Sequence, residues 1–185
     1  MKSLITSFQP FRGRARNGSQ TMGAALASDL LDQEIQHLDL PVEWGAIETL
    51  ALPLIDSFQP DIVLGLGEGS PRFLRIETLA INRRFGIDEV QKSPTGETID
   101  PAGPESAHGR WPLPETPEDS ITTSSDAGCF LCNNALYRYA LSPCRFAGFF
   151  HLPPQGTTSN EAYLSQWLPK VRHLLELTIL QMPRP

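Results

Sequence analysis

Apolar residues at the start of the chain follow first the spacing of a strand and then the spacing of a helix. Lys2–Ser7 predicts a strand, and Asn17-Gly18-Ser19 can cap a helix over Gln20–Gln33. The apolar residues of that second segment recur on one helical face: Met22, Ala25, Leu26 and Leu30. The chain is therefore expected to open with a strand and a helix.

A second helical pattern leads into a buried strand. The stretch from Glu43 to Phe58 has helical periodicity, and Pro53 should kink or shorten the helix. Asp61–Gly67 then forms a short continuous apolar run that ends in glycines, which is typical of a buried parallel strand. Functional groups often follow such strands, because ligands bind at the carboxyl ends of parallel strands.

Six prolines set the middle of the chain apart. They fall between Pro94 and Pro117, in an irregular segment at about 92–119 where no regular helix or central strand is expected. After it, Ser120–Ser124 is β-prone and Asn133–Leu141 is helical.

The last third of the chain supplies one more strand and one more helix. Arg145–Leu152 reads as a Phe-rich buried strand, and Ser159-Asn160 can cap a long helix in which Pro169 predicts a kink. Alternating strands and helices predict an α/β fold, a three-layer α/β/α sandwich with a mixed, mostly parallel central sheet. The length of 185 residues favours a single domain over 1–185.

Composition narrows the class of ligand. The net charge is −6 and the sequence pI is about 5.2, so no basic surface for nucleic acid or anionic membrane is expected. The N-terminus resembles neither a signal peptide nor a membrane span, which favours a cytoplasmic protein. Three cysteines cannot all pair with one another, and free thiols are expected.

One of these thiols stands in a setting suited to a nucleophile. Cys132 follows an Ala-Gly turn and an apolar pair, at the start of the predicted helix Asn133–Leu141. The positive end of a helix stabilises a thiolate, and the free N–H groups there can stabilise an oxyanion. A buried, inert cysteine is the alternative reading of the same residue.

Two further residues could complete the chemistry. His151 ends the predicted strand Arg145–Leu152, from which an imidazole can reach the same cleft as a helix N-terminus. Glu77 lies among apolar neighbours, where a carboxylate needs a partner to be buried. Cys132, His151 and Glu77 would supply a nucleophile, a general base and a group that orients the base.

The segments around these residues resemble the signatures of the pyroglutamyl peptidase I family, which are cysteine peptidases also called pyrrolidone-carboxylate peptidases. S-S-D-A-G-C-F-L-C-N from Ser124 matches the family's S-x-[STAD]-A-G-x-[FY]-x-C-[DN] pattern throughout. Glu77 keeps the E-x-[LIV]-A-x-N spacing, and His151 keeps its apolar strand and following proline. T-S-F-Q-P-F from Thr6 is similar to the family's T-G-F-E-P-F, and collinear matches run from about residue 6 to residue 154.

The resemblance implies hydrolysis of an N-terminal pyroglutamyl residue from a peptide or small-molecule substrate, with no cofactor and no metal. Cys132 would attack the carbonyl, His151 would act as base, and Glu77 would orient His151. An apolar slot for the flat lactam ring is implied at Phe8, Phe11, Phe130, Leu131 and Ile87. Because family members often form homotetramers, a homo-oligomer is consistent with the resemblance.

Departures from the family keep a second interpretation open. Many bacterial members have Gly-Gln where this chain has Gly67-Glu68 or Gly65-Leu66, and Arg75 replaces a small hydroxyl residue near Glu77. A helix that normally precedes the last strand before the cysteine is replaced by W-P-L-P-E-T-P-E-D, which should uncover part of the sheet or leave it to a partner subunit. The alternative is therefore an altered or inactive homologue that binds small molecules or peptides.

Two other chemistries use the same cysteines. Cys129, Cys132 and Cys144 with His151 could form a zinc site, although structural zinc sites usually have two compact ligand pairs. Cys129-x-x-Cys132 could also be a thioredoxin-like redox pair, although its position relative to the predicted βαβ units is poor.

Overall fold

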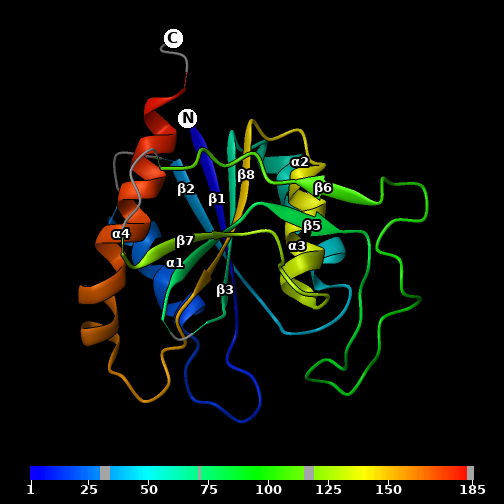
Figure 1. The fold of residues 1–185 in the computed structure, drawn as a ribbon, viewed down its shortest axis with the longest axis horizontal. Helices are drawn as coiled ribbons and strands as arrows, with labels where there is room; N and C mark the ends of the chain where they lie inside the picture. Colours follow the sequence, from blue (N-terminus) through cyan, green and yellow to red (C-terminus); the bar gives the residue numbers. More distant parts are fainter. Residues whose placement is uncertain (30–33, 71, 115–118, 183–185) are drawn as a thin grey trace.

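The computed structural model describes residues 1–29, 34–70, 72–114 and 119–182 and contains a six-stranded sheet between two layers of helices (Figure 1). The strands of this sheet lie in the order β2-β1-β3-β8-β4-β7. They are β1 (Lys2–Phe8), β2 (Glu34–Leu40), β3 (Ile62–Glu68), β4 (Leu74–Glu77), β7 (Ile121–Ser124) and β8 (Phe146–Leu152).

The sheet is mixed and mostly parallel, as predicted. β2, β1, β3 and β8 run parallel to one another, whereas β4 pairs antiparallel with β8 and parallel with β7. The carboxyl ends of β1, β3 and β8 therefore meet at one edge of the sheet, and the loops that follow β1 and β8 lie together at the bottom of Figure 1. This edge is where an α/β sheet usually binds its ligand.

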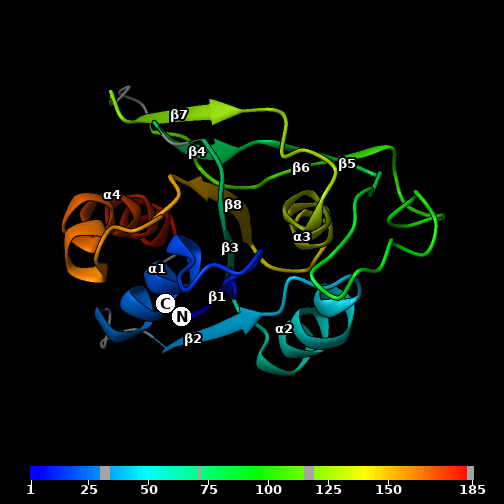
Figure 2. The ribbon, with the colours of Figure 1, turned by 90° about the horizontal axis from the view of Figure 1, so that it is seen from below.

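Helices cover both faces of the parallel strands, which gives the predicted three layers (Figure 2). α1 (Gly18–Asp29) and α4 (Asn160–Leu180) pack on one face, whereas α2 (Leu52–Phe58) and α3 (Leu131–Ala140) lie on the other. Each face has its own apolar core, with alternate residues of the buried strands pointing into each. For example, Ile62 and Leu64 contribute to the α1–α4 core, and Val63 contributes to the α2–α3 core.

The predicted helix between Glu43 and Phe58 is present in two parts. A π-helix, η1 (Ile47–Ala51), runs directly into α2, and Pro53 occupies the first turn of α2. At this junction Leu52 donates its N–H to the carbonyl of Ile47, so the proline, which has no N–H, falls where the hydrogen bonding changes from the π-helix to the α-helix. The α-helix is confined to Leu52–Phe58, shorter than the predicted stretch, with Pro53 at its start.

A two-stranded sheet and a long connection make up most of the proline-rich region. β5 (Leu79–Ile81) pairs antiparallel with β6 (Ser106–His108), and a long connection between them extends to one side of the molecule (Figure 1). The described part of 92–119 contains no helix, in agreement with the prediction; residues 115–118, with Pro117, lie outside the described residues.

This region also covers part of the sheet. Trp111 is only 6% exposed and packs edge-on against Phe150 of β8, with ring centroids 5.0 Å apart. A Cβ on Gly148 would lie 2.7 Å from the Trp111 ring, so the ring rests directly on the β8 backbone. An indole from the segment that replaces the family helix therefore covers β8 at this point.

Other predicted elements agree with the structure within a few residues. α4 is capped by Ser159, whose side chain accepts a hydrogen bond from the N–H of Ala162, and Pro169 lies inside the helix. The first helix begins at Gly18, and the predicted end at 30–33 lies outside the described residues. β2 and β4 were not anticipated from the sequence. Within the described residues, no helix is long and apolar enough to cross a bilayer.

Candidate active site

Cys132 lies in the first turn of α3, at the carboxyl edge of the sheet. α3 begins at Leu131, two residues earlier than predicted. The N-cap residue is Phe130, and its side chain makes no capping hydrogen bond to the N–H groups of the first turn. Those N–H groups and the helix dipole favour negative charge at this point. Asn133 fixes the first turn, since its side chain accepts from the N–H of Ile81 and donates to the carbonyls of Ile81 and Arg83.

Glycines in β3 let α3 approach the sheet closely. A Cβ on Gly65 would lie 2.4 Å from the Phe149 ring, and a Cβ on Gly67 would lie 3.0 Å from the sulfur of Cys132. The Cys132 sulfur therefore rests against the backbone at the end of β3. The glycines that end this strand in the sequence make room for the thiol.

His151 and Glu77 form a buried hydrogen-bonded pair beside this thiol. His151 Nδ1 lies 2.7 Å from Glu77 Oε1 across the β8–β4 boundary, with Glu77 0% and His151 6% exposed. The Phe149 ring packs edge-on against the imidazole at a centroid distance of 5.2 Å. Glu77 thus fixes the orientation of the imidazole and leaves Nε2 as its second polar atom.

The charge state of His151 is set by its neighbours. Burial opposes the charged imidazolium, but the negative charge of the Cys132 thiolate, a hydrogen bond with that sulfur and the Glu77 carboxylate together raise the pKa of His151 to about 9. The imidazolium form of His151 is therefore favoured near neutral pH. An imidazolium beside the cysteine sulfur is part of the reactive ion pair of cysteine peptidases.

Arg75 adds a cation on the far side of the carboxylate. Its Nε lies 3.5 Å from Glu77 Oε1, and both residues project from the same face of β4. Glu77 Oε2 is buried and accepts no hydrogen bond from the described residues. Oε1 therefore makes both of the strong contacts of this carboxylate.

A cavity of about 190 Å³ opens beside Cys132. All five residues implied to form a lactam slot line it: Phe8, Phe11, Phe130, Leu131 and Ile87. Phe8 and Leu131 are buried, whereas Ile87 is 63% exposed and lies at the rim. The structure therefore brings the predicted slot and the predicted nucleophile together.

The wall at Phe130 is held by an aromatic contact and by a close backbone approach. Trp44 packs edge-on against Phe130 at a centroid distance of 5.1 Å and donates its indole N–H to the carbonyl of Gly86. Gly86 has a φ of +122°, and a Cβ there would lie 2.9 Å from the Phe130 ring. The loop that carries Ile87 is thus pinned across the Phe130 side of the cavity.

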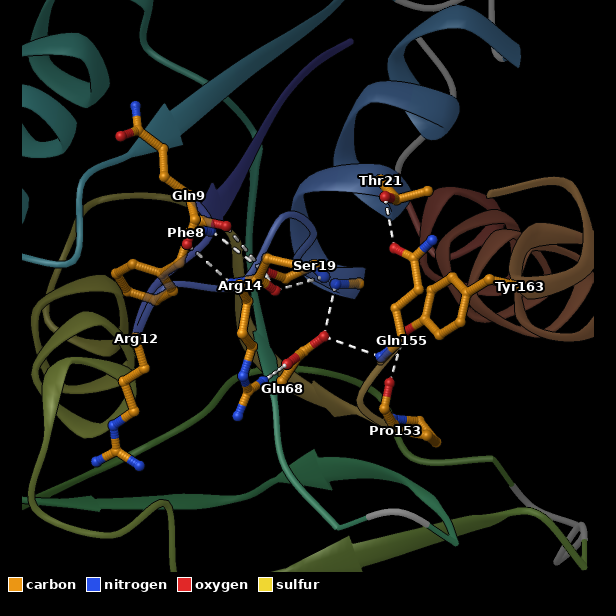
Figure 3. Close-up of polar contacts among 12 residues, drawn as sticks. Phe8, Gln9, Arg12, Arg14, Ser19, Thr21, Glu68, Pro153, Gln155 and Tyr163 are labelled. Carbon is orange, nitrogen blue, oxygen red and sulfur yellow. Dashed lines mark hydrogen bonds and ion pairs between the residues drawn. The ribbon is translucent and has the colours of Figure 1, made fainter. Parts of the chain in front are cut away.

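Charged residues at the cavity were missed by sequence reasoning as functional candidates. Glu68 and Arg14 line the cavity and form an ion pair of 2.6 Å, shown in Figure 3. Glu68 was recognised as a departure from the family pattern but was given no role. A buried acidic residue directly after the strand glycines was the available signal, and its partner lies 54 positions away.

The zinc site considered for the cysteines lacks a geometry that supports it. The three cysteines are free, as predicted, and the described residues contain no cluster of three or more His, Cys, Asp or Glu side chains suited to a metal. Cys144 precedes β8 and His151 is near the strand's end, so an extended chain separates the two by roughly 20 Å. Cys144 and His151 cannot share one zinc ion.

Sequence comparison assigns the chain to a family. A family model described as pyroglutamyl peptidase matches residues 1–163. A pyrrolidone-carboxylate peptidase of Saccharolobus islandicus is 34% identical, over 83% of this chain and 79% of the relative. One of Vibrio vulnificus is 32% identical, over 97% of this chain and 91% of the relative.

Solved structures agree at the level of the fold. A mutant pyrrolidone carboxyl peptidase from the hyperthermophile Pyrococcus furiosus superposes with a TM-score of 0.81 at 21% identity, covering 99% of this chain and all of that one. In this chain the fold carries the Cys132 segment, the buried His151–Glu77 pair and a cavity lined by Cys132. By its sequence and its fold, this chain belongs to the pyroglutamyl peptidase family.

Proposed function

We propose that this protein hydrolyses the peptide bond after an N-terminal pyroglutamyl residue, with Cys132 as nucleophile, His151 as general base and acid, and Glu77 as the group that orients His151. The observation that carries the proposal is the buried 2.7 Å contact between His151 and Glu77 beside a thiol at a helix N-terminus. The names of the relatives support the substrate class.

The first half of the reaction follows from this arrangement. The Cys132 sulfur attacks the pyroglutamyl carbonyl, and the carbonyl electrons move onto oxygen. N–H groups in the first turn of α3 can donate to that oxyanion. When the tetrahedral intermediate collapses, the C–N bond breaks, the amine takes a proton from the His151 imidazolium, and a thioester to Cys132 remains.

The second half returns the enzyme to its starting state. The neutral imidazole of His151 removes a proton from water, and the resulting hydroxide attacks the thioester carbonyl. Cleavage of the C–S bond releases pyroglutamate and restores the Cys132 thiolate beside a protonated His151. Glu77 stays hydrogen-bonded to Nδ1 throughout, so that Nε2 is the atom that exchanges protons.

One wall of the cavity suits a lactam ring. Phe8, Phe11 and Phe130 offer flat apolar contact to a compact uncharged ring. Charged side chains, among them Arg14 and Glu68, also line the cavity. The proposed specificity therefore comes from the shape and the apolar contact of the aromatic wall.

The test is hydrolysis of a fluorogenic pyroglutamyl amide. We expect wild-type protein to hydrolyse it and Cys132→Ala to lose activity by roughly a thousandfold or more. Cys129→Ser is the matched control, because Cys129 is also a partly exposed free cysteine but does not line the cavity, and it should keep nearly full activity.

Two results would contradict the proposal in different ways. Activity that survives Cys132→Ala would exclude this thiol as the nucleophile. An inactive wild-type protein that still binds a lactam would instead identify the chain as an altered or non-catalytic member of its family.

A further inference from the structure

Glu68 is a buried carboxylate at a junction of three elements, at the end of β3. Its side chain is only 3% exposed. Oε1 accepts hydrogen bonds from the backbone N–H of Gly18 at 2.7 Å and of Gln155 at 2.9 Å, while Oε2 lies 2.6 Å from Nη1 of Arg14 (Figure 3). Glu68 therefore joins the start of α1, the loop after β8 and the loop after β1.

The residues on either side of Glu68 contact Cys132 and His151, the proposed nucleophile and general base. A Cβ on Gly67 would lie 3.0 Å from the Cys132 sulfur, and a Cβ on Gly69 would lie 2.6 Å from Cβ of His151. Gly69 also donates its N–H to the carbonyl of Leu152, next to His151. Glu68 thus lies between Gly67, whose backbone contacts Cys132, and Gly69, whose backbone contacts His151.

Arg14 carries the effect of Glu68 to the cavity wall. Its guanidinium carbon lies 4.6 Å from the centroid of the Phe11 ring, and both residues line the cavity. The Arg14 side chain is 40% exposed, so without a partner it would be free to leave the ring. The short ion pair with Glu68 restrains the guanidinium over Phe11.

We propose that Glu68 is a positioning residue for the lactam-binding cavity, which it shapes by holding Arg14 against Phe11. The substrate in this inference rests on the proposed function, but the clamp itself rests on the contacts of Glu68. Glu68 touches no reacting atom; it acts through Arg14 and Phe11 on binding.

A glutamine at position 68 separates the two tasks of the carboxylate. Its amide oxygen can still accept from the N–H groups of Gly18 and Gln155, so the junction of elements is kept. Its amide nitrogen would face the Arg14 guanidinium, and two donors repel each other. Glu68→Gln should therefore release Arg14 and leave the backbone around Cys132 in place.

The experiment compares Glu68→Gln, Arg14→Met and the double variant with wild-type protein. Binding of 2-pyrrolidone is measured by ligand-observed NMR titration, and KM and kcat are measured with a fluorogenic pyroglutamyl amide. We expect each single variant to raise the Kd of 2-pyrrolidone and the KM by roughly tenfold, with kcat within about twofold of wild type. The double variant should be no worse than either single one, because the two residues act as one clamp.

Glu48→Gln is the matched control. Glu48 also pairs with an arginine, at 3.3 Å from Arg138, and is likewise mostly buried, but it does not line the cavity. We expect its Kd and KM to equal those of wild type even where its melting temperature falls. If Glu68 had only a structural role, Glu68→Gln would likewise leave Kd and KM unchanged and lower only the melting temperature.

The outcomes distinguish this inference from the proposed function. If wild-type protein binds 2-pyrrolidone and Glu68→Gln binds it equally well, or lowers kcat with KM unchanged, the positioning role is wrong whatever the activity. If wild-type protein binds the lactam without hydrolysing the amide, the proposed function fails, and a tenfold weaker Kd in Glu68→Gln still supports the clamp. If wild-type protein does neither, both proposals are overturned.

Discussion

The two halves of the central sheet are covered by different means. Helices lie on both faces of the parallel strands β2, β1, β3 and β8, whereas β4 and β7 form a short edge that runs in the opposite direction. A single indole, Trp111, packs on β8 next to this edge, and Thr122 and Thr123 of β7 are exposed. The proposed triad draws on both halves.

This division shows which part of the site is built most firmly. Cys132 and His151 belong to elements that pack on the parallel half, and Glu77 comes from the four-residue strand β4 at the edge. The orienting carboxylate therefore depends on the more thinly covered half. Substitutions in that half test how far stability and chemistry can be separated.

The largest expected effect concerns Trp111, which packs on β8 at the border of the edge half. Trp111→Ala should lower the free energy of unfolding by about 4 kcal/mol, since it empties a packed site over Gly148 and Phe150. Urea unfolding followed by circular dichroism measures this. The comparison is Trp167→Ala in α4, on the helix-covered half, where the indole is equally buried.

Equal losses in the two variants would show that one indole packs as well as a helix layer. A loss below about 1 kcal/mol for Trp111→Ala would mean that β8 is loosely covered where it borders the edge. Trp111→Phe sharpens the result, because the Trp111 indole N–H is buried without a hydrogen bond to any described residue. Removing that N–H should offset part of the lost packing.

The next largest effect is expected for Glu77, which links the two halves. Glu77→Gln should lower kcat/KM by about a hundredfold, because His151 loses the charge that orients it and stabilises its imidazolium. Steady-state kinetics on the fluorogenic amide measures the loss. Glu97→Gln, which removes an exposed ion pair with Arg83, is the control and should have no effect. Wild-type kinetics in Glu77→Gln would remove Glu77 from the mechanism.

The smallest predicted effect is a dependence of stability on pH. Burial disfavours the charged imidazole, but the Cys132 thiolate and Glu77 outweigh it, so the pKa of His151 rises from 6.5 to about 9 in the folded protein. The resulting stabilisation is complete below pH 6.5 and is lost as pH rises through 9. We expect a loss on the order of 2 kcal/mol across this interval.

The measurement is urea unfolding of wild type and His151→Gln at several pH values from 6 to 10. The difference in stability between the two proteins should shrink as pH rises. A constant difference would contradict the raised pKa. Activity should fall over the same alkaline range, because the leaving amine needs the imidazolium proton.

Much of the fold could be predicted from the sequence because strong periodicity marks buried elements. β1, β3, β8, α3 and α4 lie within a few residues of their expected positions. β2 was missed because the consecutive polar residues Gln36 and His37 interrupt the alternation of polar and apolar side chains in E-I-Q-H-L-D-L. β4 was missed because four residues that include an arginine and a glutamate give no strand signal by themselves.

The candidate site divides in the same way. Local pattern was enough to place Cys132 at a helix start, and family resemblance supplied His151, Glu77 and the aromatic residues that line the cavity. The clamp between Glu68 and Arg14 could not be predicted, because it depends on how the ends of β1, β3 and β8 meet. The exposure of Ile87 at the rim likewise follows from the path of its loop.

The short strand β4 makes spacing as important as residue identity. Leu74 and Ile76 face the α1–α4 core, whereas Arg75 and Glu77 face the opposite side, toward His151. A deletion of one residue within β4 would exchange these faces and turn Glu77 away from the imidazole. Such a chain would keep the cysteine, the histidine and the glutamate in the same order and would still lack the hydrogen bond between the histidine and the glutamate. Alignments that search this family for active members should therefore score the length of this strand together with its glutamate.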